Sequence, residues 1–284
     1  MESLKKLKEE LQFNIELTEL LDILKGIAVA QYWSLENKKD RFETFLKAFE
    51  EFFDIFDFNF VDHPMAKGGG NLGLIVITTN EGFMGGLNNR IIDTALMNEG
   101  AQSAELIVVG DRGAAYLKAM GRSCKEFPGI DPDFFYELAV DLKNYIIEQS
   151  LSGKIGRLKL FYPQSISFMV HKIQEVTLLP CHELFEKAGQ GKEPPSEVIV
   201  ESAMGDLIEY LVESWILQQL FHILEDSKLA EYSARTIHLE ESYQVSLEQH
   251  KGIKNRYFRN NREIIDRGLR DMFSAQIIKK KEKV

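Results

Sequence analysis

The stretch Leu72–Arg90 reads LGLIVITTNEGFMGGLNNR and carries the clearest fold information in the chain. Its first part, residues 72–78, is rich in leucine and β-branched residues, which is typical of a buried strand. Three glycines follow within five residues, Gly82, Gly85 and Gly86. A glycine-rich turn directly after a hydrophobic strand is a place where α/β proteins often hold a phosphate. The first question is whether this turn binds a nucleotide.

The glycine spacing fits neither of the common phosphate loops. A dinucleotide fingerprint needs G-x-G-x-x-G, and a P-loop needs G-x-x-x-x-G-K-[ST]. Here Gly86 is followed by Leu87 and Asn88, so the turn has no lysine and hydroxyl pair for phosphate and metal. A second glycine run, 68–70, comes before the strand, which is the wrong side for a phosphate loop. We expect the turn to serve another purpose.

Around this turn, strand-like and helix-like segments alternate. The strand-like segments are 72–78, 104–110, 157–163 and 166–180. The helix-like segments are 88–100, 113–120 and 132–153. Alternation of this kind predicts an α/β layer fold with a largely parallel, Rossmann-like sheet. A polar loop rich in Gly and Pro, 185–197, follows it.

Both ends of the chain have the pattern of long helices. All seven prolines lie between Pro64 and Pro195, and proline is what would break such helices. Apolar residues recur every three or four positions at both ends, and Phe42, Phe45, Phe49, Phe52 and Phe56 continue the first stripe. Some 55 residues of helix would be roughly 80 Å long and need a partner helix. We predict a long antiparallel coiled coil; the alternative is several short helices broken at Ser227 and Gly252. The predicted parts are 1–60 (coiled-coil helix), 70–195 (α/β domain) and 200–278 (coiled-coil helix).

Composition narrows the function classes. The net charge of −10 argues against a general nucleic-acid binder. No apolar run is long enough for a transmembrane helix, and the charged N-terminus does not resemble a signal peptide. The two cysteines, Cys124 and Cys181, fit a reducing cytoplasm. The charge is uneven, because residues 251–284 hold eleven Lys and Arg against four Asp and Glu. A basic end on an acidic body suggests contact with an acidic partner.

Catalytic and metal-binding patterns are weak. The six histidines are dispersed, and there is neither a G-x-S-x-G elbow nor an H-E-x-x-H motif. Asp131 and Asp133 flank Pro132, which indicates a turn and a helix cap rather than a metal site. We expect no catalytic residue, no cofactor and no metal in this chain.

The chain resembles the gamma subunit of F-type rotary ATP synthases, the central stalk. That family has a segment close to T-[ST]-D-R-G-L-C-G-G-L-N-x-N after a strand, and residues 78–90 here read TTNEGFMGGLNNR. Its early pattern A-M-K-M-V-A appears as ILKGIA at 23–28, and its late pattern E-x-x-A-R-M-x-A-M appears as EYSARTIHL at 231–239. A weaker final block runs from Tyr257 to Ala275. The resemblance covers essentially the whole chain.

The departures from the family mark a divergent member. The Asp-Arg before the glycines is Asn80-Glu81 here, which reverses the charge. The threonine and glutamate of the final block are Asp266 and Gly268. The first 60 residues carry eight Lys and Arg against thirteen Asp and Glu, although the family's first helix is usually basic. The early stretch KGIAVAQY is more similar to the gamma subunit of the alternative, sodium-type bacterial ATPases.

The resemblance implies an axle inside a ring of three alpha and three beta subunits, coupling ion flow to ATP synthesis or hydrolysis. The catalytic residues would belong to beta. The complex would lie on the cytoplasmic side of the bacterial inner membrane, and this chain would meet the membrane only through it. Residues implied near the membrane rotor ring and the epsilon subunit are Gly82, Gly85, Gly86, Leu87 and Asn88, with Asn88 capping the following helix. Residues implied to face the ring are Lys25, Arg235, Arg256, Arg259, Arg262, Arg267 and Arg270.

Two other readings fit the sequence. One is the gamma-like axle of a specialised F-type-like motor or of a secretion ATPase. The other is an α/β nucleotide-binding enzyme with helical arms, which nucleotides would stabilise against heat.

Overall fold

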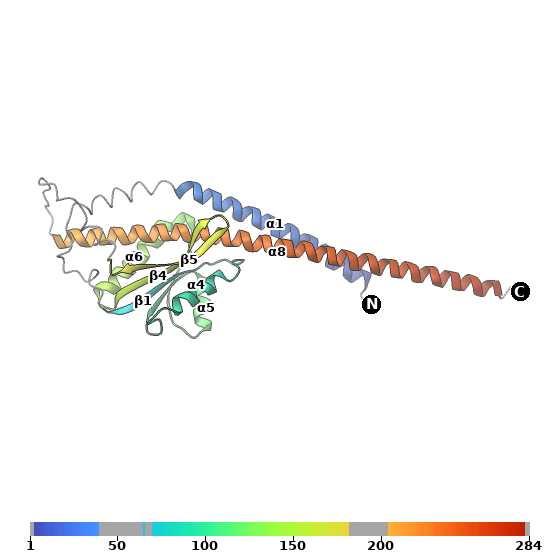
Figure 1. Cartoon of the computed structure of the whole chain (residues 1–284), viewed down its shortest axis with the longest axis horizontal. Helices are drawn as coiled ribbons and strands as arrows, with labels where there is room; N and C mark the ends of the chain where they lie inside the picture. The colour runs from blue at the N-terminus through green and yellow to red at the C-terminus, as the bar shows by residue number, and fades with distance from the viewer. Residues whose placement is uncertain (1–2, 40–64, 66–69, 182–203, 282–284) are drawn as a thin grey trace. The chain divides into compact units, whose positions relative to one another are not determined.

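The computed structural model describes residues 3–39, 65, 70–181 and 204–281. Two compact units are present, one made of residues 28–235 and the other of the two chain ends. The described helices and strands, shown in Figure 1, are α1 (Leu4–Lys39), β1 (Asn71–Ile77), α4 (Leu87–Leu96), β2 (Glu105–Val109), α5 (Asp111–Ala119), β3 (Lys125–Phe127), the 3-10 turn η1 (Pro132–Phe134), α6 (Phe135–Leu151), β4 (Ile155–Ser167), β5 (Val170–Leu179) and α8 (Met204–Lys281).

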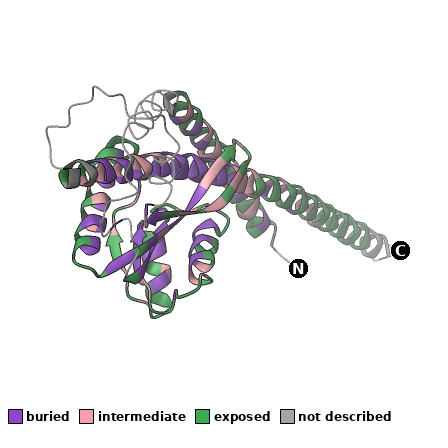
Figure 2. Ribbon diagram, turned by 60° about the vertical axis from the view of Figure 1, so that its left-hand side comes forward, coloured by how far each residue is buried: buried purple, intermediate pink, exposed green. Residues whose placement is uncertain are grey.

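Residues 28–235 are built around one five-stranded sheet in the order β3-β2-β1-β4-β5. Four strands are parallel to their neighbours, and only β5 runs antiparallel, against β4. The predicted α/β fold with a largely parallel sheet is confirmed. Alternating side chains of β1 enter two cores. Ile75 and Ile77 face a core with α6 and the first part of α8, whereas Leu74 and Val76 face a core with α4 and α5. The central strands β1 and β2 are almost entirely buried, whereas β3 and β5 at the edges are not, so the sheet in Figure 2 has both buried and exposed stretches.

The boundary predicted between the last two strands is wrong. β4 continues through Pro163 to Ser167, and β5 begins only at Val170. The reason lies in the pairing of β4. Its ladder with β1 ends at Phe161, so Pro163 has only β5 as a neighbour and its missing N–H breaks no bond to β1. The three-residue strand β3 was not predicted.

The C-terminal segment forms one continuous helix. α8 runs through Ser227 and Gly252, so the alternative of several short helices is wrong for 204–281. Ser227 lies within the helix, and its buried hydroxyl is satisfied by donating a hydrogen bond to the carbonyl oxygen of Ile223, at 2.6 Å. The phenylalanine stripe at 42–56 and the loop 185–197 lie outside the described residues. The boundaries 1–60, 70–195 and 200–278 therefore stay predictions.

The chain ends pair in antiparallel fashion, as predicted. Contacts join Glu10 to Arg256, Asn14 to Ser246 and Lys25 to Glu240. The residue numbers of the partners on α8 decrease as those on α1 increase, so the two helices run antiparallel. The residues buried along this pair include Leu7, Leu21, Leu239 and Ile253. None of the described helices is long and apolar enough to cross a membrane.

Candidate functional site

The glycine-rich loop between β1 and α4 is a tight turn that favours glycine at two positions. Gly85 and Gly86 have φ angles of 55° and 80°, which are left-handed values that other residues rarely adopt. Gly82 has no such angle. The neighbouring Met84 and Leu87 are buried and anchor the turn on the sheet. Phe83 also has a positive φ, 64°, and is 53% exposed.

The same loop also occupies the N-terminus of α5, a second helix end whose N–H groups could otherwise hold an anion. Three backbone N–H groups open α5, and each donates a hydrogen bond to the loop. The N–H of Asp111 reaches the Asn80 side-chain oxygen at 2.9 Å, that of Arg112 the Thr79 carbonyl at 3.1 Å, and that of Gly113 the Thr78 hydroxyl at 3.1 Å. An anion would have to displace all three partners. This geometry argues against a nucleotide site at α5.

Asn88 does not cap α4, and that prediction is wrong. The N-cap position belongs to Gly86, which makes no side-chain hydrogen bond. The side chain of Asn88 turns back toward the end of β1. Its oxygen accepts from the N–H of Thr79 at 3.3 Å, and its amide donates to the Thr79 hydroxyl at 2.9 Å. Asn88 therefore ties the loop closed.

By contrast, Asp131 is a cap. Its carboxylate accepts a hydrogen bond from the N–H of Asp133 at 3.0 Å, with Pro132 at the start of η1. The predicted turn and helix cap are thus confirmed.

A group of charged side chains on α8 meets the glycine-rich loop. Arg235 lies 2.6 Å from the carboxylate of Glu231, one turn earlier, and 2.6 Å from that of Glu81 in the loop. Lys228 also pairs with Glu231, at 3.0 Å. Both cations lie over the ring of Tyr232, at 5.1 and 5.8 Å. We call Lys228, Glu231, Arg235 and Glu81 the loop–helix charge cluster.

Burial shapes the protonation of this cluster. The side chain of Glu231 is only 2% exposed. Its desolvation raises the pKa of the carboxyl above the ordinary value, and the adjacent Lys228 and Arg235 oppose that shift. Burial also raises the pKa of the neighbouring Tyr232 to about 12, and the charge of Glu231 adds to that effect. The cluster therefore needs its cations to keep Glu231 ionised.

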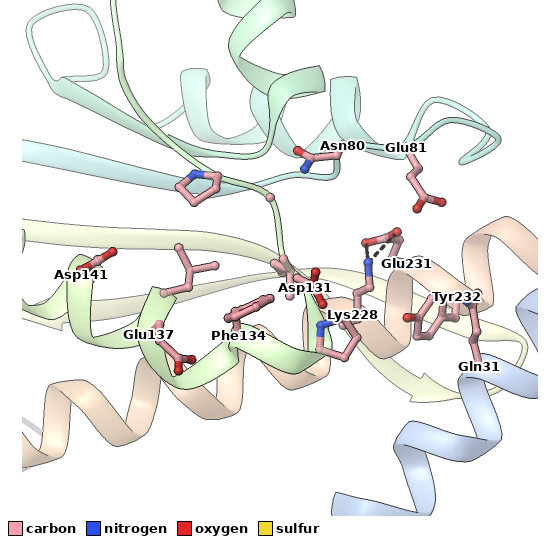
Figure 3. Close-up of a pocket in the computed structure, with 15 residues that line it drawn as sticks. Gln31, Asn80, Glu81, Asp131, Phe134, Glu137, Asp141, Lys228, Glu231 and Tyr232 are labelled. Atoms are coloured by element: carbon pink, nitrogen blue, oxygen red, sulfur yellow. Dashed lines mark hydrogen bonds and ion pairs between the residues drawn. The ribbon is translucent and has the colours of Figure 1, made fainter.

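A pocket of about 560 Å³ opens beside the cluster. Glu231, Lys228 and Tyr232 line it from α8, and the first turns of α6 line the other side, as Figure 3 shows. Carboxylates dominate its polar lining. They come from Glu81, Asp131, Glu137, Asp141 and Glu231. Over the described residues, no group of His, Cys, Asp and Glu has the arrangement of a metal site.

The residues predicted to face partners are divided between the two units. Gly82, Gly85, Gly86, Leu87 and Asn88 form the loop, with Leu87 and Asn88 buried beneath it. Arg235 joins that loop through Glu81. Glu81, Lys228 and Glu231 are not among the site residues predicted from the sequence. The spacing of 228, 231 and 235 at helical intervals was a usable signal, whereas nothing in the sequence pairs 81 with 235.

The other predicted cations lie on the paired chain ends. Lys25 bonds to Asp22 and Glu240 and lies over the ring of Tyr243, so its charge is satisfied within this chain. Arg256 pairs with Glu10 at 3.0 Å. The remaining arginines sit further along α8 and are exposed: Arg259, Arg262, Arg267 and Arg270.

We compared the sequence with protein families and with known proteins. The family model described as ATP synthase matches residues 3–275. The ATP synthase gamma chain of Pelotomaculum thermopropionicum is 29% identical over 180 residues, which are 62% of each chain. That of Alkaliphilus metalliredigens is 23% identical over 207 residues, 71% of each chain. The match spans about three fifths of the length of the first of these relatives.

Solved structures agree on the fold. A chain of the Euglena gracilis mitochondrial ATP synthase, in a structure of its OSCP, F1 and c-ring, superposes with a TM-score of 0.69 at 16% identity. The superposition covers 96% of this chain and 93% of that one. A chain from the central stalk and c-ring of the Tetrahymena thermophila enzyme gives a TM-score of 0.59 at 16% identity, covering 78% and 99%.

The fold defines a class: proteins in which an α/β layer domain lies in the chain between two long terminal helices. The family match identifies the member. The chain belongs to the ATP synthase family and is a divergent gamma subunit.

Proposed function

We propose that this chain is the rotating shaft of an F-type ATP synthase, coupling ion movement through a membrane rotor ring to ATP synthesis or hydrolysis in a ring of three alpha and three beta subunits. The shaft has no catalytic residue of its own. Its asymmetry favours a different conformation in each catalytic beta subunit, and rotation shifts those populations in turn. The family match supports this assignment.

The observation that carries the proposal is the composition of α8 at residues 262–275. Every residue in this segment is exposed. It nevertheless holds large apolar side chains, among them Ile265, Met272 and Phe273, which are 53%, 60% and 64% exposed. Arginines are interspersed with them. Exposed apolar surface of this kind marks an interaction site, and arginine pairs well with carboxylates of a partner.

The glycine-rich loop is the second surface with a proposed partner. We propose that residues 82–88 face the epsilon subunit and the membrane rotor ring. The fixed turn at Gly85 and Gly86 and the exposed Phe83 support such a contact. The complex is peripheral and lies on the cytoplasmic side of the bacterial inner membrane.

Co-expression with the alpha and beta subunits of the same genome tests the proposal. Native mass spectrometry should show three alpha, three beta and one copy of this chain. The ring should hydrolyse ATP several-fold faster with the chain than without it. A ring that neither binds the chain nor changes its ATPase rate would overturn the proposal.

The specialised-motor alternative is separated by a second measurement on the same complex. Reconstitution in vesicles with the membrane sector reports whether ATP hydrolysis drives uptake of protons or sodium ions. Uptake supports the synthase. A complex that hydrolyses ATP, binds this chain and moves no ion supports a specialised motor.

A further inference from the structure

One position of the glycine-rich loop reverses the charge of the family pattern, and the structure shows where its side chain goes. The pattern has arginine directly before the first glycine, whereas this chain has Glu81. Its carboxylate lies 2.6 Å from the guanidinium of Arg235 on α8. The side chain of Glu81 is 66% exposed, but the Arg235 side chain that it meets is only 9% exposed.

The ion pairs of the loop–helix charge cluster explain why an acidic residue fits at position 81. Lys228 and Arg235 are both nearly buried, and both use the carboxylate of Glu231. The carboxylate of Glu231 is thus shared by two cations, and Glu81 gives Arg235 a second carboxylate. An arginine at position 81 would add a third cation next to Arg235, where like charges repel.

The residue before Glu81 holds the loop from another direction. The side chain of Asn80 accepts the N–H of Asp111 at the start of α5. It also packs closely against Gly129, because a Cβ atom added at Gly129 would lie 2.2 Å from the Asn80 oxygen. Two adjacent residues of the loop therefore reach two different helices, α5 through Asn80 and α8 through Glu81.

We propose that Glu81 is a positioning residue that fastens the glycine-rich loop to α8, so that a load applied to the loop passes directly into that helix. The fastening itself follows from the contacts. Its role in carrying a load rests on the proposed function.

Hydrogen exchange on the full-length chain tests the fastening. The reporter amides are Asp111 and Arg112, whose N–H groups are held by the loop residues Asn80 and Thr79. Glu81→Gln should speed their exchange about two- to fivefold, the range expected for a partly exposed ion pair. Glu81→Arg should speed it more, and Glu81→Asp, which keeps the charge, should recover most of the protection. High salt should narrow the differences.

The matched control is Glu137→Gln, which removes an exposed carboxylate from the same pocket. It should leave exchange at Asp111 and Arg112 unchanged. Equal exchange in Glu81→Arg and the wild type would overturn the fastening. So would an equal increase in the Glu137→Gln control, because the effect would then reflect general charge in the pocket.

The load-bearing role is measured in the complete complex reconstituted in vesicles. Glu81→Arg should lower the number of ions taken up per ATP hydrolysed by about half or more, while Glu137→Gln keeps the wild-type ratio. Faster exchange with an unchanged ratio would overturn the load-bearing role. A wild-type chain that never stimulates the ring would instead overturn the proposed function, and the exchange result would stand apart from it.

Discussion

At the scale of single residues, backbone angles separate glycines that look alike in the sequence. Gly82, Gly85 and Gly86 all match the family motif, yet only the last two have left-handed φ angles. An added Cβ at Gly86 would meet no atom within 4 Å, so any cost there comes from the backbone alone. A Cβ atom added at Gly82 would also fit, because it would lie 3.6 Å from the guanidinium of Arg112.

This contrast gives a paired prediction. Gly86→Ala should lower the free energy of unfolding by about 1–2 kcal/mol, because alanine is strained at φ 80°. Gly82→Ala should change it by less than about 0.5 kcal/mol. Urea unfolding of both variants, followed by circular dichroism, checks the pair. Equal losses would mean that the φ angle is not what selects glycine at position 86.

Single residues also show where sequence reasoning stopped. Asn88 was expected to cap α4, since asparagine before a helical pattern usually does so. Its preferred partner turned out to be Thr79, at the end of the preceding strand. The charge reversal at Glu81 could be read from the sequence, but its partner could not. Contacts between positions far apart in the sequence depend on the fold, so the spacing of neighbouring residues does not predict them.

At the scale of elements, a polar layer interrupts the apolar seam between α1 and α8. The Asn14 amide donates to the hydroxyl of Ser246 at 3.3 Å, and the Thr18 hydroxyl lies 2.7 Å from the same oxygen. Asn14 and Ser246 are 3% and 2% exposed. Buried polar layers of this kind fix the register of paired helices at some cost in stability.

Removing one partner of the layer should be worse than removing two. Ser246→Ala leaves the Asn14 amide buried without this acceptor and should cost about 1–2 kcal/mol. Adding Asn14→Leu should recover most of that loss while loosening the register. Thermal unfolding measures the first effect, and disulfide trapping between cysteines placed in neighbouring registers measures the second. A double variant less stable than Ser246→Ala would contradict the idea that the layer costs stability.

Element types were easier to predict than element ends. The strand runs and the amphipathic ends gave the α/β domain and the antiparallel helices, because hydrophobic periodicity is a local property. The end of β4 was misplaced because Pro163 is acceptable only where β1 has already stopped. The short β3 makes no periodic signal at all, having only three residues. The continuity of α8 through Gly252 depends on neighbours and not on propensity alone.

At the scale of the whole molecule, high pH should destabilise the α/β unit. Burial, reinforced by the charge of Asp226, raises the pKa of Tyr162 to about 12. The neutral phenol is thus favoured in the folded state, so its contribution is complete below about pH 10 and is lost as pH rises toward 12. Tyr162→Phe should reduce the loss of unfolding free energy between about pH 10 and pH 12 by about 1–2 kcal/mol.

Denaturant titrations at a series of pH values check this. The matched control is Tyr136→Phe, because Tyr136 is 59% exposed. That variant should keep the wild-type slope. Burial also raises the pKa values of Tyr232 and Cys181 to about 12. Because these two groups are present in every variant, part of the loss of unfolding free energy with rising pH will remain in all of them. Identical slopes in the two phenylalanine variants would count against the assignment to Tyr162.

Assembly provides the second prediction at this scale. Replacing Arg262, Arg267 and Arg270 with glutamine should leave the free energy of unfolding within about 0.5 kcal/mol, since all three are exposed and glutamine is a good helix former. Association with the alpha/beta ring should slow about tenfold or more at low salt, and less at high salt.

The control replaces the exposed Lys154, Arg157 and Lys172 of the α/β unit, which changes the net charge equally. Surface plasmon resonance on immobilised ring measures the association rates. If both triple variants bind equally slowly, overall charge and not the end of α8 governs the encounter.

The antiparallel pairing of the chain ends also governs the order of events during synthesis. Residues of α1 leave the ribosome well before their partners on α8, because Ser246 lies 232 positions after Asn14 and Arg256 lies 246 positions after Glu10. At ordinary elongation rates α1 waits roughly 10–50 s for them. During that interval Leu7 and Leu21, buried in the finished protein, have no helix to cover them. A newly made chain therefore exposes this apolar face of α1 until residues 239–256 of α8 have been synthesised, and a holding chaperone would protect the face during that interval.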